Sequence, residues 1–339
     1  YHRIDEVLAS RDSTAPKTHV DVPMYIHDEF APRVNSWKSH SAWLKISEGC
    51  NHRCAFCIIP TLRGKMRSRT IESLVAEAER MAEEGVREIN LVSQDSTAYG
   101  RDMTDGTDLG SLLRALAKIE KIEWIRLHYA YPIGLPASLL TAIAEEPKVV
   151  NYLDIPLQHA SGPMLKAMRR GVTRAGQERI LDRIRDHVPG IAIRTTFIVG
   201  FPGETDEDFA ELVDFVEKQQ FERVGVFTYF QEEGTDAAQL PNQVPEEIKL
   251  ERQRILMEKQ SEISAAKLNS MVGNVFPVLI DGPSSEHEWV IGGRLETQAP
   301  EVDGLVYLDT PPDDIEPGQI RKVRIERTSD YDLVGTVIA

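Results

Sequence analysis

A repeated alternation of short apolar segments and amphipathic helices most constrains how this 339-residue chain can fold. Six segments rich in branched and aromatic residues read as strands, and apolar residues recur at helical spacing between them. The expected strands are residues 42–47, 87–93, 124–129, 152–155, 191–198 and 223–229. The expected helices are residues 70–84, 109–119, 135–145, 162–169, 174–187 and 205–216. This alternation favours a parallel sheet with functional loops at the carboxyl ends of its strands.

Six strand–helix units fall short of the eight that close a full TIM barrel. The sequence therefore predicts an α/β fold of the (βα)6 partial TIM barrel kind, open along one side. A doubly wound open sheet is the alternative, because periodicity alone does not report the order of the strands.

The pattern changes after residue 245. Residues 246–269 are expected to form one long polar, connecting helix. Five short strands are then expected at residues 275–280, 288–291, 305–308, 320–325 and 333–337, which suggests a small all-β barrel of the OB-like kind. The predicted domains are a linker or lead-in at 1–40, an α/β core at 41–245, the connecting helix, and a β-barrel domain at 270–339.

All three cysteines of the chain lie in one loop directly after the first expected strand. Cys50, Cys54 and Cys57 have the spacing Cys-x3-Cys-x2-Cys. With no fourth cysteine, they do not make a closed four-cysteine site, but they can hold three irons of a [4Fe-4S] cluster and leave the fourth open. Buried free cysteines, or a zinc site completed by His52, are the less favoured alternatives.

Net charge and the placement of the cysteines indicate which kinds of partner and which cellular compartment suit this chain. The formal net charge is −15, which is unfavourable for gripping a nucleic-acid backbone. Residues 268–339 contain thirteen Asp and Glu against five Lys and Arg, which suits a basic protein partner better than a nucleic acid. No apolar run approaches the roughly 20 residues of a membrane helix. Clustered cysteines without dispersed pairs indicate the cytoplasm.

Several motifs together resemble a known family. The loop Gly-Cys-Asn-His-Arg-Cys-Ala-Phe-Cys-Ile-Ile-Pro at 49–60 is similar to that of the radical S-adenosylmethionine (SAM) enzymes. Residues 93–100, 127–132, 153–161 and 196–205 resemble, more narrowly, the methylthiotransferases of the RimO type, and the β-rich tail occupies the position of that family's TRAM domain. The resemblance covers roughly residues 40–339.

The resemblance implies a function and its cofactors. Cys50, Cys54 and Cys57 would hold a [4Fe-4S] cluster whose open iron binds SAM, and one electron would cleave SAM to a 5′-deoxyadenosyl radical. The product would be a methylthio group on the β-carbon of an aspartate in ribosomal protein S-twelve of the small subunit. A flavodoxin or ferredoxin would supply the electron. The expected SAM-binding residues are Phe56, Ser93, Gln94, Arg194, Thr196, Val199 and Gly200.

Three further residues at strand ends are candidates for contact with the substrate: Asp95, Gln158 and His159. Asp95 could equally cap the next turn, and His159 could be a satisfied packing residue. For Arg194 the alternative is a structural ion pair.

The family also carries a second [4Fe-4S] cluster, on three cysteines of an additional N-terminal domain. These cysteines are absent from the present sequence, so we expect SAM binding and cleavage but not complete methylthiolation. Two other functions stay open. One is a tRNA adenosine methylthiotransferase, and the other is a non-catalytic iron–sulfur module that docks a ribosomal protein.

Overall fold

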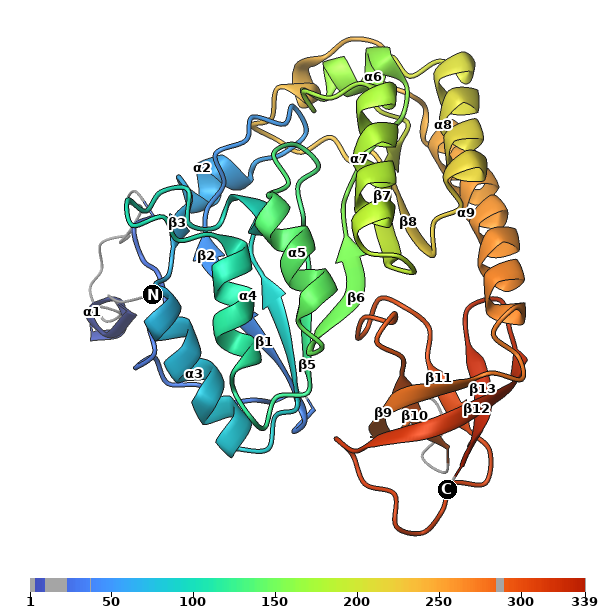
Figure 1. Cartoon of the computed structure of the whole chain (residues 1–339). Helices are drawn as coiled ribbons and strands as arrows, with labels where there is room; N and C mark the ends of the chain where they lie inside the picture. Colours follow the sequence, from blue (N-terminus) through green and yellow to red (C-terminus); the bar gives the residue numbers. More distant parts are fainter. Residues whose placement is uncertain (1–3, 10–22, 37, 285–289, 339) are drawn as a thin grey trace.

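A single parallel sheet forms the larger part of the molecule (Figure 1). The computed structural model describes residues 4–9, 23–36, 38–284 and 290–338. The sheet has the order β1-β4-β5-β6-β7-β8, with strands Ser41–Lys45, Glu88–Val92, Trp124–Leu127, Val149–Asp154, Ala192–Val199 and Arg223–Thr228. Neighbours in the sheet are also neighbours along the chain, whereas a doubly wound sheet reverses direction at its centre. The predicted (βα)6 partial barrel is therefore confirmed.

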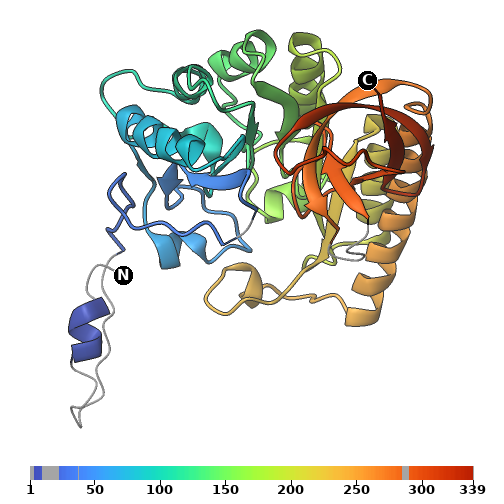
Figure 2. The ribbon, with the colours of Figure 1, turned by 90° about the horizontal axis from the view of Figure 1, so that it is seen from below.

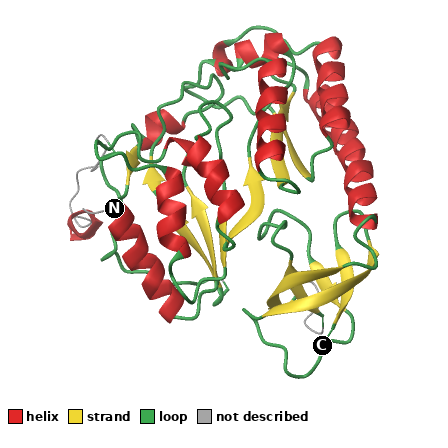
Figure 3. Cartoon of the chain, in the orientation of Figure 1, coloured by secondary structure: helices red, strands yellow, loops and turns green. Residues whose placement is uncertain are grey.

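Helices cover the outer face of this sheet (Figure 3). They are α3 (Ile71–Glu83), α4 (Leu109–Ala117), α5 (Ala137–Glu145), α6 (Gly162–Ala167), α7 (Arg174–His187) and α8 (Asp206–Gln219). Their starts follow from local sequence: Thr70 caps α3, and Thr205 with Asp208 forms a capping box on α8. Among the described residues, none of the helices combines the length and apolar character that crossing a bilayer would require.

The first expected strand is divided in two. β1 ends at Lys45, and Ser47–Glu48 (β2) pairs instead with Arg67–Ser68 (β3) in a small antiparallel ribbon. Between the two strands of this ribbon lie the cysteine loop and the short helix α2 (Ile59–Arg63). Strands of two residues are too short for a hydrophobic period, so the ribbon could not be predicted from the sequence.

The chain then passes through α9 (Glu246–Asn269) into a closed five-stranded barrel of order β10-β11-β13-β12-β9. Its strands are Val275–Pro283 (β9), Ile291–Arg294 (β10), Val306–Leu308 (β11), Ile320–Thr328 (β12) and Leu333–Val337 (β13). This confirms the small β-barrel. The strand expected at 288–291 appears as β10, later in the chain, and residues 285–289 lie outside the described residues.

The N-terminal segment differs from a featureless lead-in, because a short helix, α1, spans Ile4–Ala9. Residues 1–3, 10–22 and 37 of the expected linker at 1–40 lie outside the described part of the chain. The proposed domain boundaries stay a prediction.

The C-terminal barrel packs against the ends where the strands of the sheet begin (Figures 1 and 2). An apolar cluster joins Trp124, Val150, Tyr152 and Ala192 of the sheet to Leu279 and Ala299 of the barrel domain. The opposite opening, at the carboxyl ends of the strands, carries the cysteine loop. The C-terminal barrel thus covers one end of the partial barrel, and the cysteine loop lies at the other end.

Candidate active site

The cysteine loop is held in place by neighbours that are distant in sequence. The amide of Gly49 donates to Oε1 of Gln94 at 2.8 Å, and the amide of Cys50 donates to the carbonyl of Gly64 at 3.1 Å. The amide of Ala55 donates to the carbonyl of Met168 at 3.1 Å. These bonds come from β4's end, the β2–β3 connection and α6, so the loop is fixed on three sides before any ligand arrives.

All three cysteines line one cavity of about 410 Å³, a volume typical of a small-molecule site. Each cysteine is free and partly buried. Burial raises the pKa of the Cys50 thiol to about 11 and that of the Cys57 thiol above its ordinary value. The free thiols of Cys50 and Cys57 are therefore protonated at neutral pH, and a metal group would displace these protons on binding.

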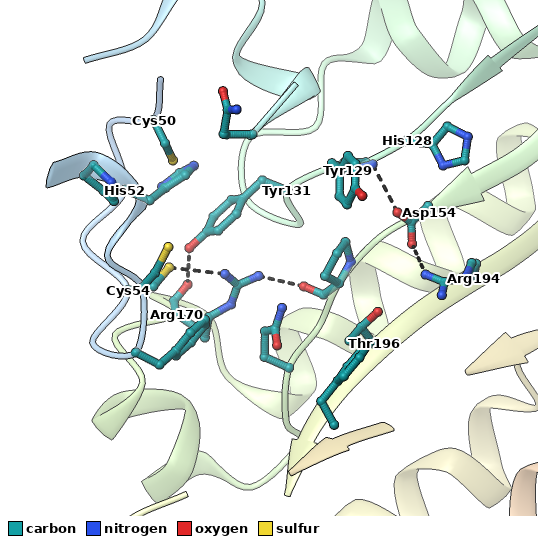
Figure 4. Close-up of a pocket in the computed structure, with 18 of the residues that line it drawn as sticks. Cys50, His52, Cys54, His128, Tyr129, Tyr131, Asp154, Arg170, Arg194 and Thr196 are labelled. Atoms are coloured by element: carbon teal, nitrogen blue, oxygen red, sulfur yellow. Dashed lines mark hydrogen bonds and ion pairs between the residues drawn. The ribbon is translucent and has the colours of Figure 1, made fainter. Parts of the chain in front are cut away.

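A chain of contacts links His52 of the cysteine loop through Tyr131 and Arg170 back to Cys54 of the same loop (Figure 4). Asp95 Oδ2 lies 2.7 Å from His52 Nε2, and the His52 ring stacks on Tyr131 with centroids 3.6 Å apart. The guanidinium of Arg170 lies 4.4 Å from the Tyr131 ring centroid and donates from Nη1 to Cys54 Sγ at 3.4 Å. Aromatic stacking and a cation–π contact thus connect a carboxylate to a cysteine.

The far end of the cavity is polar and charged (Figure 4). Arg194 Nη1 pairs with Asp154 Oδ1 at 3.1 Å, and its Nε lies 3.6 Å from Asp303 Oδ1. Tyr152 donates its hydroxyl to Asp303 Oδ2 at 2.9 Å. Asp303 belongs to the C-terminal barrel domain, whose Val302 also lines the cavity. The second domain therefore contributes directly to the wall of the site.

Five of the predicted residues beyond the cysteines line this cavity: Phe56, Gln94, Gln158, Arg194 and Thr196. Gln158 has a positive φ of 74°, stabilised by an isolated parallel bridge to Phe197. Arg194 forms the ion pair that was the alternative to SAM binding, although it still lies at the cavity wall. Their roles as ligands stay predictions.

Ser93 and Asp95 are buried and lie outside the set of cavity-lining residues. The hydroxyl oxygens of Ser93 and Ser96 are 3.1 Å apart. Asp95 accepts from the amide of Thr97 at 3.0 Å as well as contacting His52, so it caps a turn and orients the histidine at once.

His159, Val199 and Gly200 also lie away from the cavity lining. His159 is fully buried, its Nε2 is 3.9 Å from Glu204, and burial lowers its pKa to about 4. Val199 is part of the apolar core. Gly200 has φ +71°, and a Cβ there would lie 2.2 Å from Lys249 Cγ. Of these three residues, Gly200 belongs to the turn after β7, where its amide donates to Glu204 Oε2 at 2.5 Å.

Other cavity residues were not assigned a role from the sequence. His128, Tyr129, Tyr131 and Asp154 lie in the stretches 127–132 and 153–161 that carry the family resemblance, whereas Arg170 lies in none of them. The first three follow β5, Asp154 ends β6 and Arg170 follows α6, and they meet because parallel strands end at one edge. Trp43 and Phe227 also line the cavity. Positions directly after strands were the available clue, but many such positions serve only turns.

The three cysteines suit a cluster better than a single ion. Among the described residues, no three His, Cys, Asp or Glu side chains are grouped so as to hold one metal ion. In a [4Fe-4S] cluster each cysteine binds a different iron, and three cysteines that line the same cavity suit that group. Arg170, which is buried and donates from Nη1 to Cys54 Sγ at 3.4 Å, adds a positive charge beside the cysteines, and this charge suits an anionic group.

Comparison with known proteins first defines the class. The model of the Radical SAM superfamily matches residues 44–216, and that of the TRAM domain matches residues 272–338. Radical SAM proteins bind a [4Fe-4S] cluster and SAM, so membership implies both cofactors here.

Similar chains then narrow the assignment. One from Pelobacter propionicus is 48% identical over 99% of this chain and 75% of its own length. Others from Anaeromyxobacter sp. strain K and Geobacter sulfurreducens are 50% and 44% identical, over 97% and 100% of this chain and 70% and 76% of their own lengths. All three are named ribosomal protein uS12 methylthiotransferase RimO. This chain belongs to the RimO family of radical SAM methylthiotransferases.

Proposed function

We propose that this chain acts in placing a methylthio group on the β-carbon of an aspartate in a small-subunit ribosomal protein. The observation that carries the proposal is the convergence of Cys50, Cys54 and Cys57 on one cavity. The relatives, at 44–50% identity, are named for the modification of ribosomal protein uS12, which supports this choice of substrate.

The three cysteines would hold a [4Fe-4S] cluster, and SAM would lie in the cavity beside them. When bound, this pair supplies a carbon-centred radical that abstracts a hydrogen atom from the substrate. Phe56, Gln94, Gln158 and Thr196 are the cavity residues that we assign to SAM or to the substrate.

The protein's own part is to orient the reactants and to exclude water. Asp154 and Asp303 hold the Arg194 side chain at the cavity wall. Because Arg194 is already ordered, it would lose little conformational entropy when SAM or the substrate binds. Trp43 and Phe227 supply apolar surface around the reacting atoms, and such surface keeps water away from a radical.

A protein substrate would approach the open mouth of the cavity. Tyr129 and Phe227 line the cavity and are also 49% and 57% exposed, so apolar surface continues from the site to the outside. The C-terminal barrel domain, with its excess of acidic residues, would favour a basic ribosomal protein. We infer that the reaction takes place in the cytoplasm, with electrons from a flavodoxin or a ferredoxin.

The proposal is tested in two stages. Anaerobic reconstitution should give about four irons per chain and dithionite-dependent 5′-deoxyadenosine. Variants with Cys50→Ala, Cys54→Ala or Cys57→Ala should lose both, whereas Ser96→Ala should keep them. A full cluster that yields no 5′-deoxyadenosine would refute the enzymatic assignment.

The substrate is identified by isotope transfer, which does not require sulfur insertion. Ribosomal protein uS12 carrying deuterium at its aspartate β-carbons should transfer deuterium to 5′-deoxyadenosine. Transfer from a labelled tRNA adenosine instead would favour the tRNA alternative. Binding of uS12 that survives Cys50→Ala, without SAM turnover in the unsubstituted chain, would favour a docking module.

A further inference from the structure

Arg170 is a buried cation directly beside the cysteine loop (Figure 4). The residue is 4% exposed. Its Nη1 donates to Cys54 Sγ at 3.4 Å, and its Nη2 donates to the carbonyl of Pro156 at 2.7 Å. One edge of the guanidinium is therefore anchored on backbone, and the other is directed at a cysteine sulfur.

The position of this guanidinium is firmly set. The Tyr131 ring covers one face at 4.4 Å, and the Tyr131 hydroxyl donates to the carbonyl of Arg170 at 3.1 Å. The amide of Arg170 donates to the carbonyl of Leu165 at 2.9 Å, which fixes the backbone after α6. A side chain clamped by its ring neighbour and its own backbone does not swing away to solvent.

Arg170 has no carboxylate partner among the ion pairs of the described residues, and its buried Nε has no hydrogen-bond partner. Five other arginines of the described residues are buried, and four of them pair with a carboxylate: Arg69 with Glu77, Arg126 with Glu88, Arg252 with Glu204, and Arg294 with Glu88. The fifth, Arg223, is 9% exposed and has no carboxylate partner among the described ion pairs. A buried cation without a counter-charge is strongly unfavourable. Arg170, unlike Arg223, lines the cavity of the three cysteines and donates to one of their sulfurs, so an anion is expected beside it.

We propose that Arg170 is the counter-charge of the cluster held by the three cysteines and favours its one-electron reduction. This inference rests on the proposed function. The three thiolates make the oxidised cluster anionic, and the electron taken from the reductant adds one further negative charge without a proton. A fixed cation in a low-dielectric site stabilises the more negative state more strongly, and its N–H···S bond acts in the same direction.

The test is a redox titration of the reconstituted cluster, followed by electron paramagnetic resonance in the absence of SAM. Arg170→Gln should lower the equilibrium constant for reduction at least tenfold, which is a shift of about 59 mV to more negative potential for one electron. Arg170→Met is the second neutral variant if Arg170→Gln does not fold. Arg170→Lys, which keeps the charge, should stay closer to the unsubstituted protein.

Arg169→Gln is the matched control, because Arg169 is exposed and pairs with the exposed Asp236. It should leave the potential unchanged. An unchanged potential in Arg170→Gln together with weaker SAM binding would overturn the inference and assign Arg170 to the SAM carboxylate. An unchanged potential and unchanged SAM binding would make it a structural clamp. If the unsubstituted chain holds no cluster, it is the proposed function that fails.

Discussion

Arg294 of β10 and Glu88 of β4 form an ion pair in which both side chains are fully buried, with Nη2 and Oε2 2.6 Å apart. Glu88 also pairs with Arg126 at 3.1 Å, and Arg294 with Asp281 at 2.8 Å between Nε and Oδ2. Since Arg294 and Asp281 belong to the C-terminal barrel and Glu88 and Arg126 to the sheet, this network joins the two. It lies at the end of the partial barrel opposite the cysteines.

Replacing Arg294 by a neutral residue should lower the free energy of unfolding. Arg294→Met removes one buried cation that Glu88 and Asp281 share, and leaves Glu88 with Arg126 and Asp281 with Lys38 and His40. The free energy of unfolding should fall by about 3 kcal/mol. Urea denaturation followed by circular dichroism measures this loss. Arg254→Met is the control: Arg254 pairs with exposed Glu251 and Glu258, and its loss should cost about 1 kcal/mol or less. Equal losses in the two variants would show that the buried network does not hold the domains together.

The same network predicts sensitivity to acid. The adjacent Arg294 and Arg126 guanidinium groups outweigh burial and lower the pKa of Glu88 to about 2 from a model-compound value of 4.5. A depressed pKa means that the unfolded chain binds a proton first, so this stabilisation is present above pH 4.5 and is lost as the pH falls toward 2. Unfolding measured between pH 6 and 2 should show a steeper fall for the unsubstituted chain than for Glu88→Gln. If stability falls equally with pH in the unsubstituted chain and in Glu88→Gln, Glu88 is not the source of the acid sensitivity.

His128 should add a separate pH dependence at higher pH. Burial, followed by the nearby Arg126, lowers its pKa to about 3, so the folded protein keeps it neutral. The unfolded chain takes up a proton below about pH 6.5, and stability should therefore drop by about 2 kcal/mol between pH 7.5 and 5.0 from this residue. His128→Gln should remove that part of the slope. His187→Gln, at an exposed position in the last turn of α7, should leave the slope unchanged.

Gly49 should be essential for the shape of the cysteine loop. Its φ is +88°, and a Cβ would lie 2.3 Å from the carbonyl oxygen of Lys65. Gly49→Ala should therefore displace the loop and greatly reduce iron loading on reconstitution. Gly85→Ala is the matched control, because Gly85 has φ +106° with no atom within 4 Å of the added Cβ. That variant should lose about 1–2 kcal/mol of stability and keep its iron. Full loading of Gly49→Ala would show that the loop tolerates the displacement.

The parts of the site that could be predicted are those whose sequence pattern lies within one loop or one turn. The spacing of Cys50, Cys54 and Cys57 and the capping of α8 by Thr205 lie within one loop or one turn, so both could be read directly. The family resemblance implies Ser93 as a SAM-binding residue, and Asp95 is a candidate because it lies at a strand end, yet the structure directs both into hydrogen bonds beside the cavity. A strand end fixes the neighbourhood of a residue, but the twist of the chain after it decides where the side chain points.

By itself the sequence determined the six strand–helix units, the C-terminal barrel and the three-cysteine loop, because hydrophobic periodicity and cysteine spacing act over a few residues. Only the tertiary structure decided that Arg170, 116 residues from Cys54, donates to its sulfur, and that Asp303 of the barrel domain reaches Arg194 of β7. These contacts depend on the order of strands in the sheet and on how one domain packs against another. No local pattern encodes that packing, because it results from burying many distant side chains at once.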